Sequence, residues 1–236
     1  MELRATAVER AALGPDDIDR MFSLYAASYC DTARAQFDRD LGDKTHCIVL
    51  RDGGGAIQGF STLKQYETRW RDAPIRVIFS GDTIIDPAHW GTQHLAFAWI
   101  RHAGDVWRQA PAVPLYWFLI CKGHRTYRYL RAFARDYAPR ADNLTAPATQ
   151  DLMDHLAASR YGQAYDPATG ILSFDTPQGR LTPPLAEVPV AHRRLADVGY
   201  FLARNPGYAH GDELVCLCEL SASNLRPLAR RLFDGA

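Results

Sequence analysis

The fold is decided by residues 77–101, VIFSGDTIIDPAHWGTQHLAFAWIR. This stretch predicts a buried strand, a tight turn and a helix, and backbone N–H groups at such a helix start can hold a phosphate. The apolar residues 77–79 suit the centre of a sheet, yet residues 80–83, Ser-Gly-Asp-Thr, interrupt them. Buried polar groups are costly unless they are paired. The interruption therefore indicates either a functional site or a β-bulge with a satisfied polar network.

The composition is that of a globular protein with no bulk signature of nucleic-acid or membrane binding. The chain has 236 residues, 47% hydrophobic and 23% charged, with a formal net charge of zero. Residues 1–13 are too charged for a secretory signal, and no apolar run approaches the ~20 residues of a membrane span. Five cysteines at irregular spacing form neither a disulfide framework nor a metal-ligand pattern. We expect a cytoplasmic protein with reduced thiols.

Hydrophobic periodicity predicts alternating strands and helices in the first part of the chain. The strands are expected at 2–10, 46–50, 57–67, 75–85 and 115–121, and the helices at 16–29, 32–41, 91–108 and 126–137, with Pro139 as the stop. Residues 52–55, Asp-Gly-Gly-Gly, are interpreted as a hairpin turn, because they lead into a strand and not into a phosphate-binding helix.

The last part of the chain has a weaker pattern. Helices are expected at 149–159, 191–204 and 224–233, and a strand at 213–220. Two short strands, 171–174 and 180–182, flank a Thr-Pro-Gln-Gly turn. These residues carry no motif with a functional interpretation.

The element order, together with residues 82–91, DTIIDPAHWG, resembles the GNAT superfamily of acyl-CoA-dependent N-acyltransferases. The resemblance covers residues 1–140 and is best at 77–137. It implies an α/β (α+β) fold with a mixed, mostly antiparallel central sheet flanked by helices. Residues 1–140 would be the acyltransferase core, and residues 141–236 an α+β extension packed on the core sheet or completing it.

The resemblance implies transfer of an acyl group from acyl-CoA or an acyl-carrier protein to an amine of a small molecule or amino acid, without a tightly bound cofactor. In such proteins a bulge opens the fourth strand away from the fifth, the pantetheine arm lies in that cleft, and the following turn binds the pyrophosphate. The matching donor-binding positions are Ile84, Ile85, Trp90, Gly91, Thr92, Gln93, His94 and Arg125.

The turn departs from the family pattern Arg/Gln-x-x-Gly-x-Gly/Ala. Only Gly91 is kept, because Trp90, Gln93 and Leu95 occupy the other positions of the pattern. Glycines there allow close backbone approach to phosphate, so a wider turn or a different donor pose is implied. Members that use carrier proteins, and relatives that have lost catalysis, also depart from the pattern. A non-catalytic binding protein is therefore the alternative hypothesis.

Asp82 is the candidate general base, since burial beside apolar strands would raise its pKa; a structural carboxylate is the alternative. Ser80, Gly81 and Trp117 are the candidate substrate-binding residues, and backbone amides near Gly81 could polarise the thioester carbonyl. The family's usual tyrosine acid maps onto Phe133, so Tyr127 and Tyr129 are the candidate acids, with packing as the alternative for both.

A basic helix face follows the strand at 115–121. Residues 122–125, Lys-Gly-His-Arg, open the helix, and Asp136 is the single acid near its arginines 125, 128, 131 and 135. This face predicts contact with the donor's adenosine phosphate or with an acidic carrier protein; a solvated charged face is the alternative.

Three other chemistries have weaker support. His94 and His102 match no strong metal motif, and Cys121 with His124 suggests either a thiol nucleophile or a buried structural thiol. No Gly-x-Ser-x-Gly sequence marks a serine hydrolase. Five tryptophans, 70, 90, 99, 107 and 117, suggest an aromatic-lined cleft or simply a core.

Overall fold

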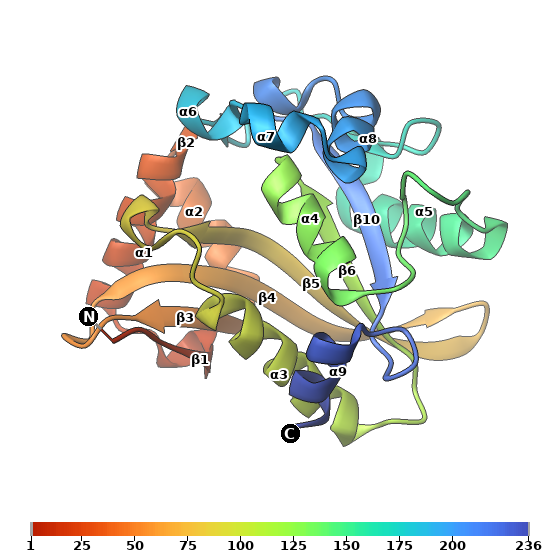
Figure 1. Cartoon of the computed structure of the whole chain (residues 1–236), viewed down its shortest axis with the longest axis horizontal. Coiled ribbons are helices and arrows are strands. Elements are labelled where there is room, and N and C mark those ends of the chain that lie inside the picture. The colour runs from red at the N-terminus through yellow and green to blue at the C-terminus, as the bar shows by residue number, and fades with distance from the viewer. Residues whose placement is uncertain (1, 236) are drawn as a thin grey trace.

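The computed structural model describes residues 2–235 and is built on one eight-stranded sheet (Figure 1). Neighbouring strands are antiparallel except for one central parallel pair, β5 with β6. The strands in spatial order are β1 (Arg4–Glu9), β3 (His46–Arg51), β4 (Ile57–Trp70), β5 (Ala73–Ile85), β6 (Leu115–Cys121), β10 (Glu213–Glu219), β8 (Ile171–Leu172) and β7 (Tyr165–Asp166). The predicted fold class, a mixed and mostly antiparallel sheet flanked by helices, is confirmed.

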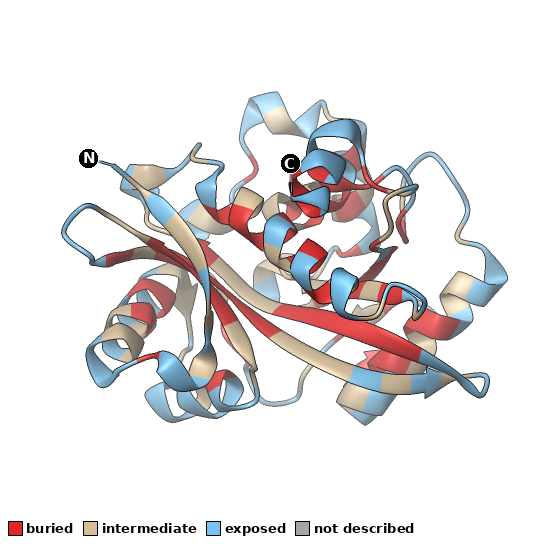
Figure 2. Cartoon of the chain, turned by 90° about the horizontal axis from the view of Figure 1, so that it is seen from below, coloured by how far each residue is buried: buried red, intermediate tan, exposed pale blue. Residues whose placement is uncertain are grey.

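Helices cover both faces of this sheet (Figure 2). One face carries α3 (His94–Gln109), α4 (His124–Phe133), α8 (Ala196–Arg204) and α9 (Pro227–Asp234). The opposite face carries α1 (Pro15–Ser28) and α2 (Arg34–Gly42) over one half and α5 (Pro147–Tyr161) over the other. The short elements are η1 (Arg10–Ala12), β2 (Tyr29–Cys30), η2 (Pro87–His89), η3 (Gly162–Ala164), β9 (Arg180–Leu181), α6 (Pro183–Ala186), α7 (Val190–Arg193) and η4 (Tyr208–His210).

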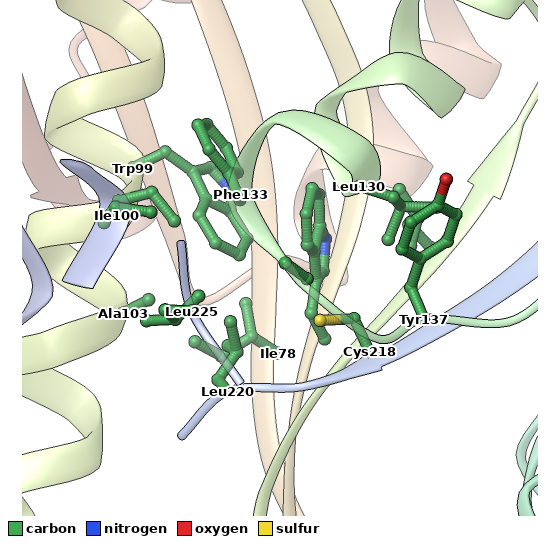
Figure 3. Close-up of a cluster of buried hydrophobic side chains, with 14 of the residues drawn as sticks. Ile78, Trp99, Ile100, Ala103, Leu130, Phe133, Tyr137, Cys218, Leu220 and Leu225 are labelled. Carbon is green, nitrogen blue, oxygen red and sulfur yellow. The ribbon is translucent and has the colours of Figure 1, made fainter. Parts of the chain in front are cut away.

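The largest core lies between the sheet and the α3–α4 face. Side chains alternate along a strand, so β6 sends Trp117 and Leu119 into this core and Phe118 into the core beneath α5. Figure 3 shows Trp99 of α3 beside Phe133 of α4, with the two rings 6.4 Å apart. The apolar stripe of α3 is therefore fixed against both β6 and α4.

The interruption in β5 is a β-bulge at which two strands separate. Ser61 of β4 pairs with Thr83 and Leu63 pairs with Ser80, so Gly81 and Asp82 stand opposite a single residue of β4. The parallel ladder between β5 and β6 ends at Ser80. The predicted bulge and the predicted opening between these strands are both confirmed.

Several predicted boundaries were wrong. Helix α3 begins at His94 and not at 91, because Gly91 has a φ of 91°, which no right-handed helix accommodates. Helix α4 ends at Phe133, four residues early, because the chain after it pairs with the C-terminal segment: Arg226 N donates to Phe133 O, and Arg135 N donates to Asn224 O. These backbone hydrogen bonds to a distant part of the chain replace the ones that would continue the helix.

The C-terminal part differs from its prediction in two places. The expected helix at 191–204 is broken into α7 and α8 by Leu195, whose backbone is extended. The short strands β8 and β9 do not pair with each other, since β8 pairs with β10 and β9 pairs with β2. Residues 141–236 contribute β7, β8 and β10 to the main sheet, and β10 pairs with β6 along its length.

Candidate functional site

Two pockets meet where β5 leaves β6. The first, here called the splay pocket, opens toward α3 and α4, and the second, the polar pocket, opens toward α1, α2 and α5. Thr83 and Thr126 line both. The splay pocket is also lined by Ser61, Ser80, Leu95, Ala96, Trp99, Trp117, Tyr129 and Phe133. The polar pocket is also lined by Tyr25, Tyr29, Asp40, Lys44, Phe79, Gly81, Asp82, Ile120, Lys122, Arg160, Tyr161, Phe174, Gln178 and Glu213. The opening between the strands thus connects two faces of the sheet.

The splay pocket is narrow and mostly aromatic. Its volume is about 20 Å³, room for about one water molecule. Trp117 lies 4.4 Å from Trp99 and 6.1 Å from Phe133, measured between ring centroids. The Trp117 indole donates to Ser80 Oγ at 2.5 Å, which satisfies the indole N–H and one of the polar groups that interrupt the apolar strand.

Asp82 is an unpaired carboxylate of the polar pocket, in which the other unpaired one, Asp40, lies at the exposed rim. It stands in the bulge, and among residues 2–235 its side chain makes no hydrogen bond or ion pair to another side chain. Burial raises the pKa of this carboxyl, while the charges of Lys122 and Lys44 act in the opposite direction. A carboxylate in this state can accept a proton from a bound ammonium group.

A second carboxylate, Glu213, is already paired in the same pocket. Lys122 Nζ lies 3.3 Å from its Oε1 and also donates to the carbonyls of Gln178 and Gly179, at 3.0 and 2.8 Å. Burial raises the pKa of Glu213, with Lys122 lowering it and Asp82 raising it further. Lys122 and Glu213 therefore neutralise each other.

Two further cations stack on one aromatic ring. Arg160 and Lys44 lie 4.1 and 5.5 Å from the centroid of Phe79. Arg160 pairs with Asp43 at 2.5 Å, whereas Lys44 Nζ donates only to the carbonyl of Asp40, at 2.8 Å. Burial lowers the pKa of Lys44. Its ammonium group carries three N–H donors and uses one for the carbonyl of Asp40, so it can still donate to a ligand in the pocket.

The turn before α3 closes one end of the opening. The exposed Trp90 donates its indole N–H to Ile85 O at 2.9 Å, and the guanidinium of Arg125 lies 5.4 Å from the Trp90 ring. Arg125 also donates to Leu185 O at 2.7 Å. Trp90 and Arg125 thus connect the β5–α3 turn to α4 across the opening.

The N-cap residue of α3, Gln93, makes no side-chain cap hydrogen bond. Thr92 Oγ1 accepts from the first N–H group of the helix, that of His94, at 3.4 Å, and also lies 2.7 Å from His94 Nδ1. Uncapped N–H groups and the helix dipole favour an anion at this end.

Comparisons with known proteins found similar solved structures only at low sequence identity. No family model and no curated protein matches the chain. One similar structure is a probable N-acyltransferase from Enterococcus faecalis, with 13% identity, a TM-score of 0.44, and coverage of 58% of this chain and 33% of that chain. Two others are an acyl-CoA N-acyltransferase from Pseudomonas aeruginosa (17%, 0.41, 56% and 88%) and a GNAT family N-acetyltransferase from Escherichia coli in complex with CoA (17%, 0.39, 56% and 70%). This chain spans about a third of the first of these proteins.

The two candidate tyrosines occupy different environments. Tyr127 is fully buried, its hydroxyl donates to Pro139 O at 2.8 Å, and it lines neither pocket. The expectation that Tyr127 is the acid is therefore wrong for this geometry, since its hydroxyl is used in packing the core. Tyr129 lines the splay pocket, and burial raises its pKa, so it is protonated at neutral pH.

The basic face of α4 is partly neutralised. Arg128 lies 3.5 Å from Asp197 of α8, and Arg135 donates to Leu225 O at 3.3 Å. A broad groove of about 560 Å³ runs between α4, α8 and the start of α9. It is lined by Arg125, Arg128, Tyr129, Arg131, Ala132, Leu195, Ala196, Asp197 and Arg226.

The thiol interpretation does not fit the structure. Cys121 is fully buried, and burial raises its pKa well above the ordinary value, which opposes thiolate formation. The ring of His124 faces His192 at 3.3 Å between nitrogens. Among residues 2–235, no group of three or more His, Cys, Asp or Glu side chains is placed to hold a metal ion. Over the same residues, no helix is both long and apolar enough to cross a membrane.

Sequence reasoning missed most of the polar pocket. Lys44 lies in a loop, Tyr25 fits the apolar stripe of α1, and Tyr29 follows that helix in β2, so none of them carries a local signal. Glu213 does carry a local signal, because it is a charged residue at the start of an otherwise apolar strand. The pocket is assembled from segments far apart in the chain, which spacing rules do not address.

Proposed function

We propose that this protein transfers an acyl group from an acyl thioester, acyl-CoA or acyl-carrier protein, to the amine of a small molecule, with Asp82 as general base. The observation that carries this proposal is the unpaired Asp82 carboxylate in the polar pocket, next in sequence to Thr83, which lines both pockets. A donor entering between α3 and α4 and an acceptor entering from the opposite face would meet at that bulge. Orienting two reactants at one point is itself a large part of catalysis.

The reaction follows from these positions. Asp82 takes a proton from the acceptor's ammonium group, and the freed amine attacks the thioester carbonyl. The carbonyl oxygen gains negative charge, which N–H groups of the bulge near Gly81 would stabilise. The C–N bond forms, the C–S bond breaks, and the departing thiolate takes a proton from Tyr129 or from water. The nitrogen, positively charged after its attack, gives up its second proton to that same donor, which restores the donor and leaves a neutral amide. Tyr129 suits this role because its hydroxyl is protonated at neutral pH.

Donor binding requires the splay pocket to widen. Its volume of about 20 Å³ does not hold a pantetheine arm. Tyr129 and Phe133, both on α4, form one wall, so a shift of these side chains opens the pocket from that side. The start of α3 and the nearby Arg125 are the groups suited to the donor's phosphates.

The test is Asp82→Asn, assayed by thiol release from acetyl-, medium- and long-chain acyl-CoA with a panel of primary amines. We expect kcat/KM to fall by about 10²–10⁴-fold, the usual contribution of a general base. Asp38→Asn, at an exposed position of α2 that lines neither pocket, is the matched control and should retain activity. Asp82→Asn with wild-type activity would eliminate Asp82 as the base.

The pH profile gives a second readout of the same role. Because the base must be ionised, the wild-type rate should fall as the pH falls through the pKa of Asp82, which burial has raised above the ordinary range of an aspartate. Any residual rate of Asp82→Asn should lack this acidic limb. An unchanged limb in the variant would assign the titration to another group.

A non-catalytic binding protein is the second candidate, favoured by the narrowness of the splay pocket and by Gln93 and Leu95 in the turn. Native mass spectrometry with CoA, acyl-CoA and acyl-carrier protein separates the two. Binding of these donors without thiol release in the presence of any amine would support this second function.

A further inference from the structure

Two opposite charges of the polar pocket lie close together but do not touch. Asp82 and Lys44 both line the pocket, and they form no ion pair with each other. A methyl group added to Gly81 would lie 3.7 Å from Lys44 Nζ. The ammonium group of Lys44 therefore lies beside the residue that immediately precedes Asp82.

The other buried charges of the pocket already have partners. Lys122 is bonded to Glu213 and to two carbonyls, and Arg160 is bonded to Asp43. The carboxylate of Asp40 has no partner among residues 2–235, but it lies at the exposed rim, where water solvates it. Lys44 donates to one carbonyl only and carries three N–H groups. Inside the rim, the capacity left for a charged ligand is thus one carboxylate, Asp82, and one ammonium group, Lys44.

Such a pair of separated charges is complementary to a molecule with its own ammonium and carboxylate groups a few ångströms apart. A charge in a low-dielectric pocket gains most from a partner that brings the opposite charge and hydrogen bonds. A simple amine would satisfy Asp82 but leave Lys44 facing its hydrocarbon part. A zwitterion would satisfy both.

We propose that the acceptor is a free α-amino acid, with its nitrogen at Asp82 and its carboxylate bonded to Lys44. This inference rests on the proposed acyl transfer, whose acceptor class it specifies. The pocket volume is about 150 Å³, which at ~15 Å³ for each water-sized site suits a ligand of about ten non-hydrogen atoms. Phenylalanine- or leucine-sized amino acids are within this size.

The pocket walls also fit this ligand. Tyr25 and Tyr29 line it, and among residues 2–235 their hydroxyls have no hydrogen-bond partner. Phe174 adds an apolar wall, and the pairing of β2 with β9 covers one side. Since the α-carboxylate is the recognised group, a peptide N-terminus, which has an amide there, should bind poorly.

The experiment is ligand-observed NMR and calorimetric titration of the full chain with three matched probe sets: the common α-amino acids, their α-amides and their decarboxylated amines. At least one α-amino acid should bind ten-fold or more tightly than its own amide and amine. Lys44→Met should abolish this preference, whereas Lys44→Arg, which keeps the charge, and Asp38→Asn, which lies outside both pockets, should retain it. Thermal melts of each variant establish that it is folded.

The outcomes separate this inference from the proposed function. Equal affinity for an amino acid, its amide and its amine, or no binding by any α-amino acid, would overturn the acceptor class. Thiol release with simple amines in that case would leave acyl transfer standing. Selective amino-acid binding without thiol release from any donor would instead overturn the acyl transfer while leaving the ligand class supported.

Discussion

Gly81 lies in the bulge and lines the polar pocket, and its missing side chain leaves the space that Thr62 and Lys44 occupy. A Cβ at this position would lie 2.7 Å from Thr62 Oγ1 and 3.0 Å from Lys44 Cε. The lysine stem is flexible, but a threonine is stiff at χ1. We expect Gly81→Ala to lower the free energy of unfolding by about 1–3 kcal/mol, as overpacking does, and to displace Lys44. Urea denaturation measures the first effect and amino-acid titration the second.

Thr62 supplies the control for that substitution. Its hydroxyl is buried without a hydrogen-bond partner, so Thr62→Ala removes the clashing atom and no hydrogen bond. In the double variant with Gly81→Ala, most of the lost stability should return. If the stability losses of the two single variants simply add in the double variant, the strain caused by Gly81→Ala does not come from contact with Thr62.

His124, at the start of α4, gives the protein a built-in acid sensitivity. It is 1% exposed, and burial, with Arg125, His192 and Arg128 nearby, lowers its pKa to about 4. Between pH ~6.5, the unperturbed value, and pH 4, the unfolded chain binds a proton that the folded chain does not. Stability is therefore lost as the pH falls through this window, by about 2 kcal/mol for this residue at pH 5.

His124→Gln tests this contribution. Denaturant unfolding at pH 7 and pH 5 should show a smaller pH-dependent loss in the variant than in the wild type, whatever its stability at pH 7. His102, whose pKa burial also lowers to about 4, remains in both proteins and accounts for part of the slope that persists. An identical slope in the two proteins would contradict the assignment to His124.

Among the secondary-structure elements, α4 sets the width of the splay pocket. Phe133, in its last turn, is 9% exposed and packs on Trp117 and Trp99. Phe133→Ala should lower the free energy of unfolding by about 3 kcal/mol and enlarge the pocket on the donor side. We expect tighter binding of long-chain acyl-CoA than in the wild type, measured by native mass spectrometry.

The matched variant for this prediction is Phe118→Ala. Phe118 is fully buried, but it belongs to the core beneath α5 and lines neither pocket. Phe118→Ala should lower the free energy of unfolding by a similar amount, and it should not raise the affinity for acyl-CoA. A gain in both variants would mean that general loosening, and not the space left by Phe133, admits the donor.

The elements also show how far the sequence predicts this molecule. Local signals located β5, its bulge and β6, because Ser80–Gly81–Asp82–Thr83 interrupts an apolar strand and the apolar run of β6 has the length of a strand. They did not predict the end of α4 at Phe133, which depends on pairing with residues some ninety positions later. Asp82 was predicted for the same local reason. The position of Lys44 beside Gly81, by contrast, arises only when the chain folds, so no local pattern indicates it.

At the scale of the whole molecule, the C-terminal residues complete the fold. β10 pairs with β6 at six positions, from Leu214 with Cys121 to Glu219 with Tyr116. α9 packs on α3 so closely that a Cβ on Gly104 would lie 2.0 Å from Phe233 O, and Arg108 donates to that same carbonyl at 2.6 Å. Residues 1–140 alone would leave β6 as a long apolar edge, which favours aggregation.

We therefore expect a chain ended at residue 140 to lack a cooperative thermal transition and to aggregate, as judged by circular dichroism and size-exclusion chromatography. Its losses would include the β6–β10 ladder, the α3–α9 contact, and Glu213 of the polar pocket. Adding residues 141–236 as a separate chain should restore a cooperative transition if the missing contacts are the cause. A monomeric, cooperatively unfolding chain of residues 1–140 would contradict this and make residues 141–236 a dispensable cover of the acceptor side.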